Sequence, residues 1–360
     1  MRIAVFSSIP WDFLKQRPQA LATELANMGH EVYYMEPFMF NRCPGCLVRE
    51  ARKSTRLRPT SHPRLNLFSS PFFWSTTKYA RYFPLNGLLS RRIVRFLRKS
   101  KIDFAIIQDA GYVDTALSSG IPFAYDHVDD MQHMDAVPKD YYLEKMARVK
   151  ETSVFNIYTQ PMHADEDAKG LCIPNGCYPG EFFPVEARKD FDAVFIGCLA
   201  RWCDMDSILR SNKRILLIGP MDVVDEGDNL QKYLNARKNN IYYIPTISKE
   251  VANLWLNSAR VGLVPFKEDH PVVQYAMPVK ILEYFLCELP VVTFRNAGIE
   301  LQYGDRVVYY SSIGNGRSLD DAIDIALQAG PKHEYREFAE QYAWPRLVEK
   351  LDERIRQHIV

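Results

Sequence analysis

The segment at residues 259–294 constrains the fold more than any other part of the sequence. Its apolar residues 261–264 predict a buried strand, and a polar loop follows. Pro278 predicts the start of a helix, because the first helical turn leaves its N–H groups unpaired and tolerates proline. A second apolar run at residues 290–294 predicts another strand. Strand, helix and strand in this order are typical of a parallel α/β sheet.

Two charged residues on the predicted helix favour a nucleotide ligand. Lys280 and Glu283 are three positions apart, so they lie on one helix face near the N-terminus, where backbone amides attract anions. A lysine beside free amides suits a diphosphate. A carboxylate one turn later can accept hydrogen bonds from two neighbouring hydroxyls, as on a ribose. A nucleotide-sugar meets both demands; the alternative for Lys280 is an ordinary exposed surface lysine.

The rest of the chain alternates short apolar strands with amphipathic helices, in two series. The first series of expected strands comprises residues 2–7, 31–35, 104–108, 122–126 and 154–159. The second comprises residues 191–197, 214–218, 241–244, 261–264, 290–294 and 307–310. Because 360 residues that are 47% hydrophobic can bury two cores, we expect two domains, with residues 174–184 as the linker. The expected boundaries are 1–180 and 181–340, with a final helix at 341–360.

The nucleotide-binding motifs of other α/β classes are absent from the sequence. Neither half has G-x-G-x-x-G after its first strand, which disfavours a nicotinamide dehydrogenase, and no Walker A lysine motif occurs, which excludes a P-loop enzyme. The remaining architecture is two Rossmann-like domains that face a cleft, with ligands at the carboxyl ends of the strands.

Four segments resemble GT-B glycosyltransferases. The P-x-K-x-x-E-Y of residues 278–284, followed by ELPVV, resembles their donor-binding segment. The opening of their acceptor domain is similar to the N-terminal WDFLKQRPQALATELANMGHEVYYMEP. Their domain junction is similar to IPNGCYPGEFFP. The first strand and loop of their donor domain are similar to FIGCLARW. The resemblance implies a GT-B fold, a nucleotide-sugar donor with its ribose on Glu283, and a final helix that crosses back to the first domain.

Further donor-binding candidates follow the first two strands of the second series. The backbone near Gly197 and Leu199 is suited to approach a phosphate, with Arg201 supplying charge. Gly219, after the next strand, is a candidate for lining the base pocket. The alternative for both glycines is a simple turn.

No metal ion or cofactor is expected. Asp204 and Asp206 form an Asp-x-Asp, which we interpret as an acid pair at a helix start. Cys43 and Cys46 form a CxxC, but no second CxxC or paired His motif accompanies them, so a plain loop is favoured over a zinc or redox site.

The acidic segment AYDHVDDM supplies candidates for a catalytic base. A strand expected at residues 122–126 delivers Asp126, His127, Asp129 and Asp130 to its carboxyl end, where α/β sites lie. A sugar transfer with inversion needs one base to take the proton of the acceptor hydroxyl. The segment is similar to one in xanthan-type glucuronosyltransferases, in which Asp129 matches an essential Asp. The alternative is that these acids cap the next helix.

The position of Tyr275 favours inversion. Resemblance to retaining GT-B enzymes implies two glutamates eight positions apart, and Tyr275 occupies the place of the first one.

The region between residues 42 and 101 is strongly basic, although the whole chain has a net charge of only +1. It contains fifteen Lys or Arg residues against one acid, Glu50. The candidates for contact with a membrane or acceptor in this region are Arg91, Arg92, Arg95, Arg98, Lys99 and Trp74. Cations with interleaved aromatic residues suit an anionic membrane leaflet. Nucleic acid is not expected because no nucleic-acid motif is present; the alternative is a charged solvent face.

These observations predict a cytoplasmic enzyme on the inner leaflet of the plasma membrane. No apolar run approaches the roughly 20 residues that span a bilayer, and seven scattered cysteines fit reduced thiols. We expect transfer of a sugar from a nucleotide donor, foremost a uridine diphosphate sugar, to a lipid-linked or growing surface glycan. Two alternatives stay open: a nucleotide-sugar epimerase, and a basic protein that binds nucleic acid or another anionic polymer.

Overall fold

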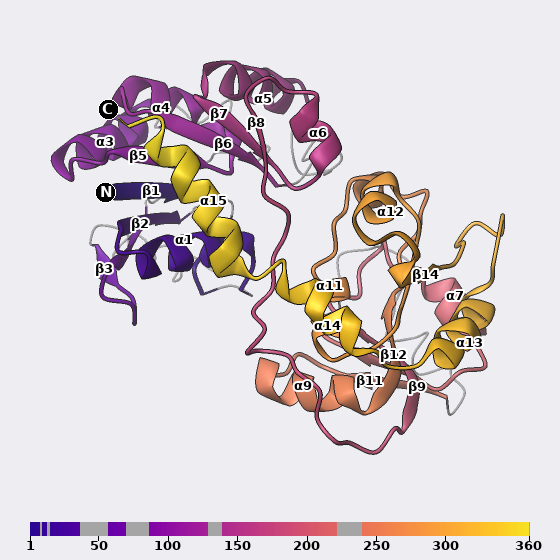
Figure 1. Cartoon of the computed structure of the whole chain (residues 1–360). Helices are drawn as coiled ribbons and strands as arrows, with labels where there is room; N and C mark the ends of the chain where they lie inside the picture. Colours follow the sequence, from indigo (N-terminus) through magenta and orange to yellow (C-terminus); the bar gives the residue numbers. More distant parts are fainter. Residues whose placement is uncertain are drawn as a thin grey trace, which may run out of the picture. The chain divides into compact units, whose positions relative to one another are not determined.

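The computed structural model describes residues 1–7, 9–12, 15–36, 57–69, 86–128, 139–221 and 240–359. The chain divides into two compact units (Figure 1). Unit 1 comprises Met1–Pro174 and Trp344–Val360, and unit 2 comprises Asn175–Ala343. Each unit contains its own β-sheet and its own helices.

Unit 1 contains an eight-stranded sheet in the order β3-β4-β2-β1-β5-β6-β7-β8. All neighbouring strands are parallel except β3 and β4. The strands are β1 (Arg2–Phe6), β2 (Glu31–Glu36), β3 (Arg58–Pro59), β4 (Leu65–Ser69), β5 (Phe104–Ile107), β6 (Phe123–His127), β7 (Phe155–Tyr158) and β8 (Gly170–Cys172). The helices are α1 (Arg17–Asn27), α3 (Asn86–Lys99), η2 (Ala110–Tyr112), α4 (Val113–Ser119), α5 (Lys139–Thr152), α6 (Pro161–Asp165) and α15 (Trp344–Arg356).

Unit 2 contains a six-stranded, fully parallel sheet in the order β11-β10-β9-β12-β13-β14. The strands are β9 (Phe191–Ile196), β10 (Ile215–Ile218), β11 (Ile241–Ile244), β12 (Ala259–Val264), β13 (Val291–Thr293) and β14 (Val307–Tyr309). The helices are α7 (Met205–Arg210), α9 (Lys249–Asn257), α10 (Pro271–Gln274), α11 (Lys280–Leu286), α12 (Ala297–Tyr303), η4 (Gly304–Arg306), α13 (Leu319–Ala329) and α14 (His333–Glu340).

Strand order places the candidate sites. In unit 1, β1 lies between β2 and β5, and in unit 2, β9 lies between β10 and β12. The chain therefore adds strands first on one side of the central strand and later on its other side. At such a reversal the loops after the strands separate, and α/β proteins bind ligands there, at the carboxyl ends.

Every strand expected from the sequence is confirmed, with ends that differ by one or two residues. The reason is that the central strands are apolar along their whole length, as parallel strands buried on both faces require. β10, for example, reads ILLI and is buried throughout. The sequence analysis missed β3, β4 and β8 in unit 1, and the short helix α10 in unit 2.

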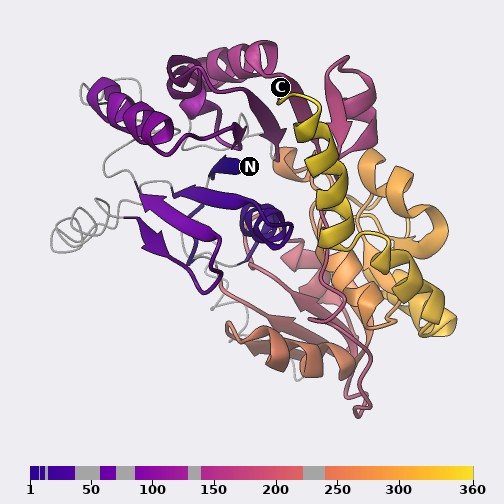
Figure 2. The ribbon, with the colours of Figure 1, turned by 60° about the vertical axis from the view of Figure 1, so that its left-hand side comes forward.

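The last helix, α15, belongs to unit 1 and packs beside α1 (Figure 2). Nε2 of His30, which follows α1, lies 2.8 Å from Oδ1 of Asp352 on α15, and both residues are buried. Burial lowers the pKa of the His30 imidazole, while Asp352 acts in the opposite direction. This polar contact fixes the helix on unit 1.

Candidate functional site

The helix that carries Lys280 and Glu283 begins two residues later than the sequence predicts. α11 starts at Lys280, and Pro278 precedes it in the loop, where its carbonyl accepts a hydrogen bond from the Ile281 amide. The expected helix start at Pro278 was therefore wrong, although both charged residues still lie in the first turn. Proline disfavours helical geometry for the residue before it, which fits the absence of helix at residues 276–278.

Tyr284 fixes α11 against the sheet of unit 2. Its hydroxyl donates to the carbonyl of Leu263 at 3.0 Å and accepts from the amide of Ile196 at 3.0 Å, so it joins β12 to β9. A Cβ atom added at Gly262 would lie 2.3 Å from the Tyr284 ring, so only glycine fits there. Burial raises the pKa of Tyr284 far above its ordinary value, so the hydroxyl stays a donor.

Lys280 and Glu283 form a loose pair at the carboxyl end of the sheet. Nζ of Lys280 lies 3.5 Å from Oε2 of Glu283, and the two side chains are 32% and 12% exposed. A Cβ atom added at Gly197 would lie 3.6 Å from Cε of Lys280. The lysine therefore reaches the loop after β9, as a cation for a phosphate there requires.

Gly197 and Gly219 bring the ends of β9 and β10 together. A Cβ atom added at Gly219 would lie 2.1 Å from the carbonyl oxygen of Gly197, and Gly219 has φ +135°, which side chains rarely adopt. The hydroxyl of Tyr243 donates to the Gly219 carbonyl at 2.9 Å. The donor-site candidates Gly197, Gly219 and Lys280 thus lie close together. Close backbone approach requires glycine at position 219, whereas a Cβ atom at position 197 would meet the Phe195 ring at 2.9 Å.

The loop after β9 differs in detail from the expectation. The amide of Leu199 donates to the Pro220 carbonyl at 2.8 Å, and its side chain lies in the core. The prediction that this amide faces a phosphate was therefore wrong in this structure, because the amide is needed to pair the loops after β9 and β10. Arg201, two residues later, is exposed. Its guanidinium remains a candidate for contact with a phosphate of a nucleotide ligand.

The Asp-x-Asp motif acts as predicted at a helix start. Asp204 is the N-cap of α7, and its carboxylate accepts from the Ser207 amide at 3.1 Å. Asp206 lies in the first turn of the same helix. Among the residues that the structure describes, no group of three or more His, Cys, Asp or Glu side chains has a geometry that could hold a metal ion.

Asp126 in unit 1 is a structural residue. Its carboxylate is fully buried and pairs with Arg17, whose Nη2 and Nε lie 2.8 Å and 2.9 Å from the two oxygens. Nε2 of Gln108 donates to the same carboxylate at 2.8 Å. Asp126 was one of the alternative candidates for the catalytic base, and its enclosure by these partners argues against that role, because a base must reach the substrate. Arg17 and Gln108 were not found from the sequence, which has no signal for such distant pairing.

His127 follows Asp126 at the end of β6 and is partly exposed. Its ring contacts the rings of Tyr125 and Tyr158, with centroids 5.7 Å apart in both cases. It remains a candidate base at the carboxyl end of the sheet. The other two candidates, Asp129 and Asp130, lie outside the described residues.

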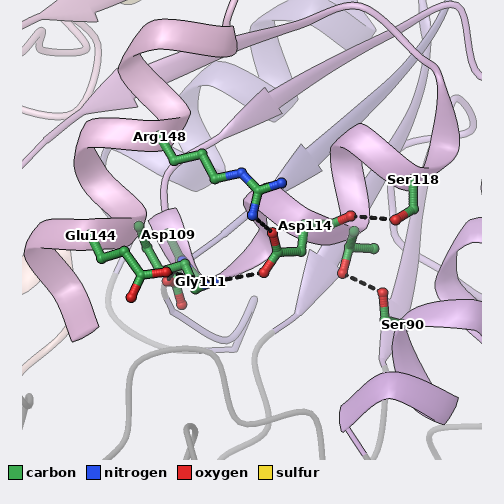
Figure 3. A network of polar contacts seen from close by, with 9 residues as sticks. Ser90, Asp109, Gly111, Asp114, Ser118, Glu144 and Arg148 are labelled. Atoms are coloured by element: carbon green, nitrogen blue, oxygen red, sulfur yellow. Dashed lines mark hydrogen bonds and ion pairs between the residues drawn. The ribbon is translucent and has the colours of Figure 1, made fainter.

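A further acid follows β5 at the same edge of the sheet. Asp109 is buried, and its carboxylate accepts from the Gly111 amide at 2.9 Å, which caps η2. Figure 3 shows Asp109 near this turn and Arg148 of α5 reaching Asp114, with Nη1 and Oδ1 2.6 Å apart. These polar contacts hold α4, α5 and η2 beside the edge, and they give both acids a structural role.

α3 presents the basic face that the sequence predicted. Arg91, Arg92, Arg95 and Lys99 are exposed, and within the described part of the chain none of the four makes an ion pair. Arg98 differs, because its guanidinium donates to the carbonyls of Ser118 and Ser119 at 2.8 Å and 3.3 Å. It serves at least in part to attach α3 to α4.

Several further candidates have no structural description. Trp74, Cys43 and Cys46 lie outside the described residues. Among the helices that are described, none combines the length and apolar character that crossing a bilayer requires.

No protein-family model and no curated protein matches this sequence. Solved structures match along the whole chain. Sucrose-phosphate synthase from Thermosynechococcus elongatus is 14% identical, with a TM-score of 0.70, over 99% of this chain and 98% of that one. HepE of Anabaena in complex with UDP-glucose is 12% identical, with a TM-score of 0.68, over 99% and 100%. An E. coli trehalose-6-phosphate protein bound with UDP-2-fluoro glucose is 12% identical, with a TM-score of 0.67, over 99% of both chains.

These likenesses, together with two parallel-dominated sheets in separate units, show that the chain has the GT-B fold. The expected fold class is confirmed.

The structural role of Asp126 leads to a stability prediction. Asp126→Ala leaves the Arg17 charge buried without its partner, so we expect unit 1 to lose about 3–5 kcal/mol of unfolding free energy, measured by urea denaturation. Glu166→Ala is the control, because Glu166 in the same unit is 79% exposed and its pair with His163 lies near the surface; it should cost about 1 kcal/mol or less. The double variant Arg17→Met, Asp126→Leu should recover much of the loss. A cost for Asp126→Ala no larger than the control would contradict the assignment.

Proposed function

We propose that this protein is a glycosyltransferase that moves a sugar from a nucleotide-sugar, foremost a uridine diphosphate sugar, to an acceptor hydroxyl. The observation that carries the proposal is the Lys280–Glu283 pair, fixed by Tyr284 beside Gly197 at the carboxyl end of the unit 2 sheet. The likeness to HepE, whose structure is a complex with UDP-glucose, supports a nucleotide-sugar as the ligand of this site.

Lys280 binds the diphosphate under this proposal. A compact ammonium group that is one-third exposed can leave Glu283 at little cost and contact a phosphate that approaches the loop after β9. When the bond between the sugar and the diphosphate breaks, negative charge grows on the leaving oxygen. The lysine then stabilises the transition state more than the ground state, and this difference accelerates the reaction.

Glu283 binds the ribose. Its carboxylate is held one turn after Lys280 and is only 12% exposed, so it accepts hydrogen bonds in a largely dry environment. Two neighbouring hydroxyls suit its two oxygens. A nucleotide without one of these hydroxyls leaves the carboxylate partly unsatisfied, which gives the site preference for ribose.

The chemical step needs a base, and we assign this role to Asp129. The base takes the proton of the acceptor hydroxyl, the acceptor oxygen forms a bond to the anomeric carbon, and the nucleoside diphosphate leaves with the electrons of the broken bond. Tyr275 in place of a glutamate favours inversion at that carbon. Tyr275 is 44% exposed and directly follows α10, in the loop that leads to Lys280.

The acceptor is a lipid-linked or growing surface glycan, which unit 1 meets at the cytoplasmic leaflet of the plasma membrane. The exposed cations of α3 support this assignment, because such a face is attracted to anionic lipid. Leu88 on the same helix is 59% exposed and adds an apolar contact.

The nucleotide site is tested by calorimetry with uridine diphosphate. Lys280→Ala should weaken binding by about 1.5–3 kcal/mol, roughly 10- to 150-fold, because it removes a charged partner of the diphosphate. Lys332→Ala is the matched control, since Lys332 in the same unit also pairs with a glutamate at 3.5 Å; it should bind normally. Equal affinity of the Lys280→Ala variant and the wild type would remove Lys280 from the site. Failure of the wild type to bind any uridine nucleotide would refute the proposed function, and release of a changed nucleotide-sugar without an acceptor would indicate an epimerase.

Variants of the acidic segment test the base. Asp129→Asn should lower kcat by about 10²–10⁴-fold while leaving the affinity for uridine diphosphate unchanged, because a general base contributes about that much and the nucleotide site lies in unit 2. His127→Ala, measured in parallel, identifies the base if Asp129→Asn keeps its activity. NMR of the product decides the stereochemistry, and retention of the anomeric configuration would refute both inversion and this role.

Sedimentation with vesicles tests the basic face. The double variant Arg91→Gln, Arg95→Gln should lose about 2 kcal/mol of affinity for anionic vesicles, roughly thirtyfold, because each nearby cation contributes about 1 kcal/mol. The control is Arg346→Gln, Lys350→Gln, which removes two exposed cations of α15 in the same unit. Wild-type binding should fall as salt rises. Equal losses in both double variants would indicate nonspecific attraction and not a membrane face.

A further inference from the structure

Two asparagine side chains hold the loop that leads into α11. Nδ2 of Asn296 donates to the carbonyls of Val273 and Ala276 at 3.1 Å and 2.9 Å. Nδ2 of Asn175 donates to the next carbonyl, that of Met277, at 3.0 Å. The loop is therefore held by amide groups on successive carbonyls just before Lys280. Such contacts restrict a segment that would otherwise be free to move.

Asn175 differs from Asn296 in its place along the chain. It is the first residue of unit 2 and directly follows Pro174, the last residue of the main segment of unit 1. Asn296, in contrast, caps α12 within unit 2. Asn175 thus attaches the peptide that joins the units to the loop that positions Lys280.

The other end of the joining peptide is held by Arg17. Its Nη1 donates to the carbonyls of Ile173 and Pro174 at 2.9 Å and 3.2 Å, while the rest of the guanidinium pairs with Asp126. Three consecutive residues, 173–175, are therefore held at one end by the carboxyl edge of the unit 1 sheet and at the other by the Met277 carbonyl.

We propose that Asn175 is a positioning residue that couples a nucleoside diphosphate on Lys280 and Glu283 to the joining peptide at residues 173–175. The proposal rests on the proposed function of this pair. A bound diphosphate restrains Lys280 and hence the loop from Met277 onwards. The Asn175 hydrogen bond extends this restraint to the joining peptide. Fewer openings of that peptide then appear as slower amide hydrogen exchange.

The structure favours Asn175 as the coupling residue over its neighbours. Gly176 has no side chain, and Cys177 bonds to the returning chain instead, with its amide on the Tyr342 carbonyl at 3.0 Å. Burial raises the pKa of the Cys177 thiol to about 12, which keeps it protonated at neutral pH. Within residues 173–177, as the structure describes them, the side chain that reaches the loop before Lys280 is the amide of Asn175.

Hydrogen exchange of the full chain, with and without saturating uridine diphosphate, tests the coupling. In the wild type we expect slower exchange in peptides covering residues 280–287 and also in those covering 173–178. In Asn175→Ala, residues 280–287 should stay protected by nucleotide, binding should weaken by no more than roughly tenfold, and the protection of 173–178 should be lost. Asn175→Asp keeps the shape but lacks the donor, so it should behave in the same way.

Asn296→Ala is the matched control. It removes the other asparagine contacts to the same loop, yet protection of residues 173–178 by nucleotide should persist. Protection of 173–178 that survives in both Asn175 variants overturns the coupling, and so does its absence in the wild type when 280–287 are protected. Absence of protection at 280–287 in the wild type refutes the nucleotide site itself, and the coupling with it.

Discussion

The buried guanidinium of Arg17 connects parts of unit 1 that are far apart in the sequence. It pairs with Asp126 at the end of β6 and with carbonyls at the point where the chain leaves the unit. It also lies 5.9 Å from the ring of Trp344, where the chain returns. Removing two charges from water is costly, and here the cost is offset by a bidentate pair and by further acceptors for the remaining N–H groups. The carboxyl edge of the sheet and both ends of the crossing chain therefore depend on this one side chain.

The two ion pairs, Arg17–Asp126 and Lys280–Glu283, differ in burial and in geometry. Arg17 and Asp126 are 3% and 0% exposed at 2.8 Å, whereas Lys280 and Glu283 are 32% and 12% exposed at 3.5 Å. A closed buried pair cannot exchange its partner without a large penalty, and a loose pair near the surface can. Charge and position in the sequence do not distinguish these cases, since all four residues lie near the ends of strands or helices. Burial and geometry distinguish the closed pair from the loose one.

The sequence was sufficient to predict the central strands and the Lys280–Glu283 turn, because both depend on local patterns. It was insufficient where the pattern is short or the partner distant. β3 has two residues and β8 three, and β4 lies within the basic region, so its apolar residues did not stand out. Asp126 looked like a catalytic acid because its partner, Arg17, lies 109 residues away. Pro278 was taken for a helix start because proline is frequent at the first helical position, whereas here it precedes the helix by two residues.

At 12–14% identity, the similar structures share a fold over nearly the whole chain. Such a likeness is possible because the fold depends on apolar strands and a few close contacts, such as that between Gly262 and Tyr284, which constrain few residue types. Exposed positions outside these constraints are free to differ among proteins that share the fold. Tyr275, exposed on the loop before Lys280, and the cations of α3 are of this kind. The chemistry of this protein must therefore be argued from its own side chains, because fold alone does not specify function.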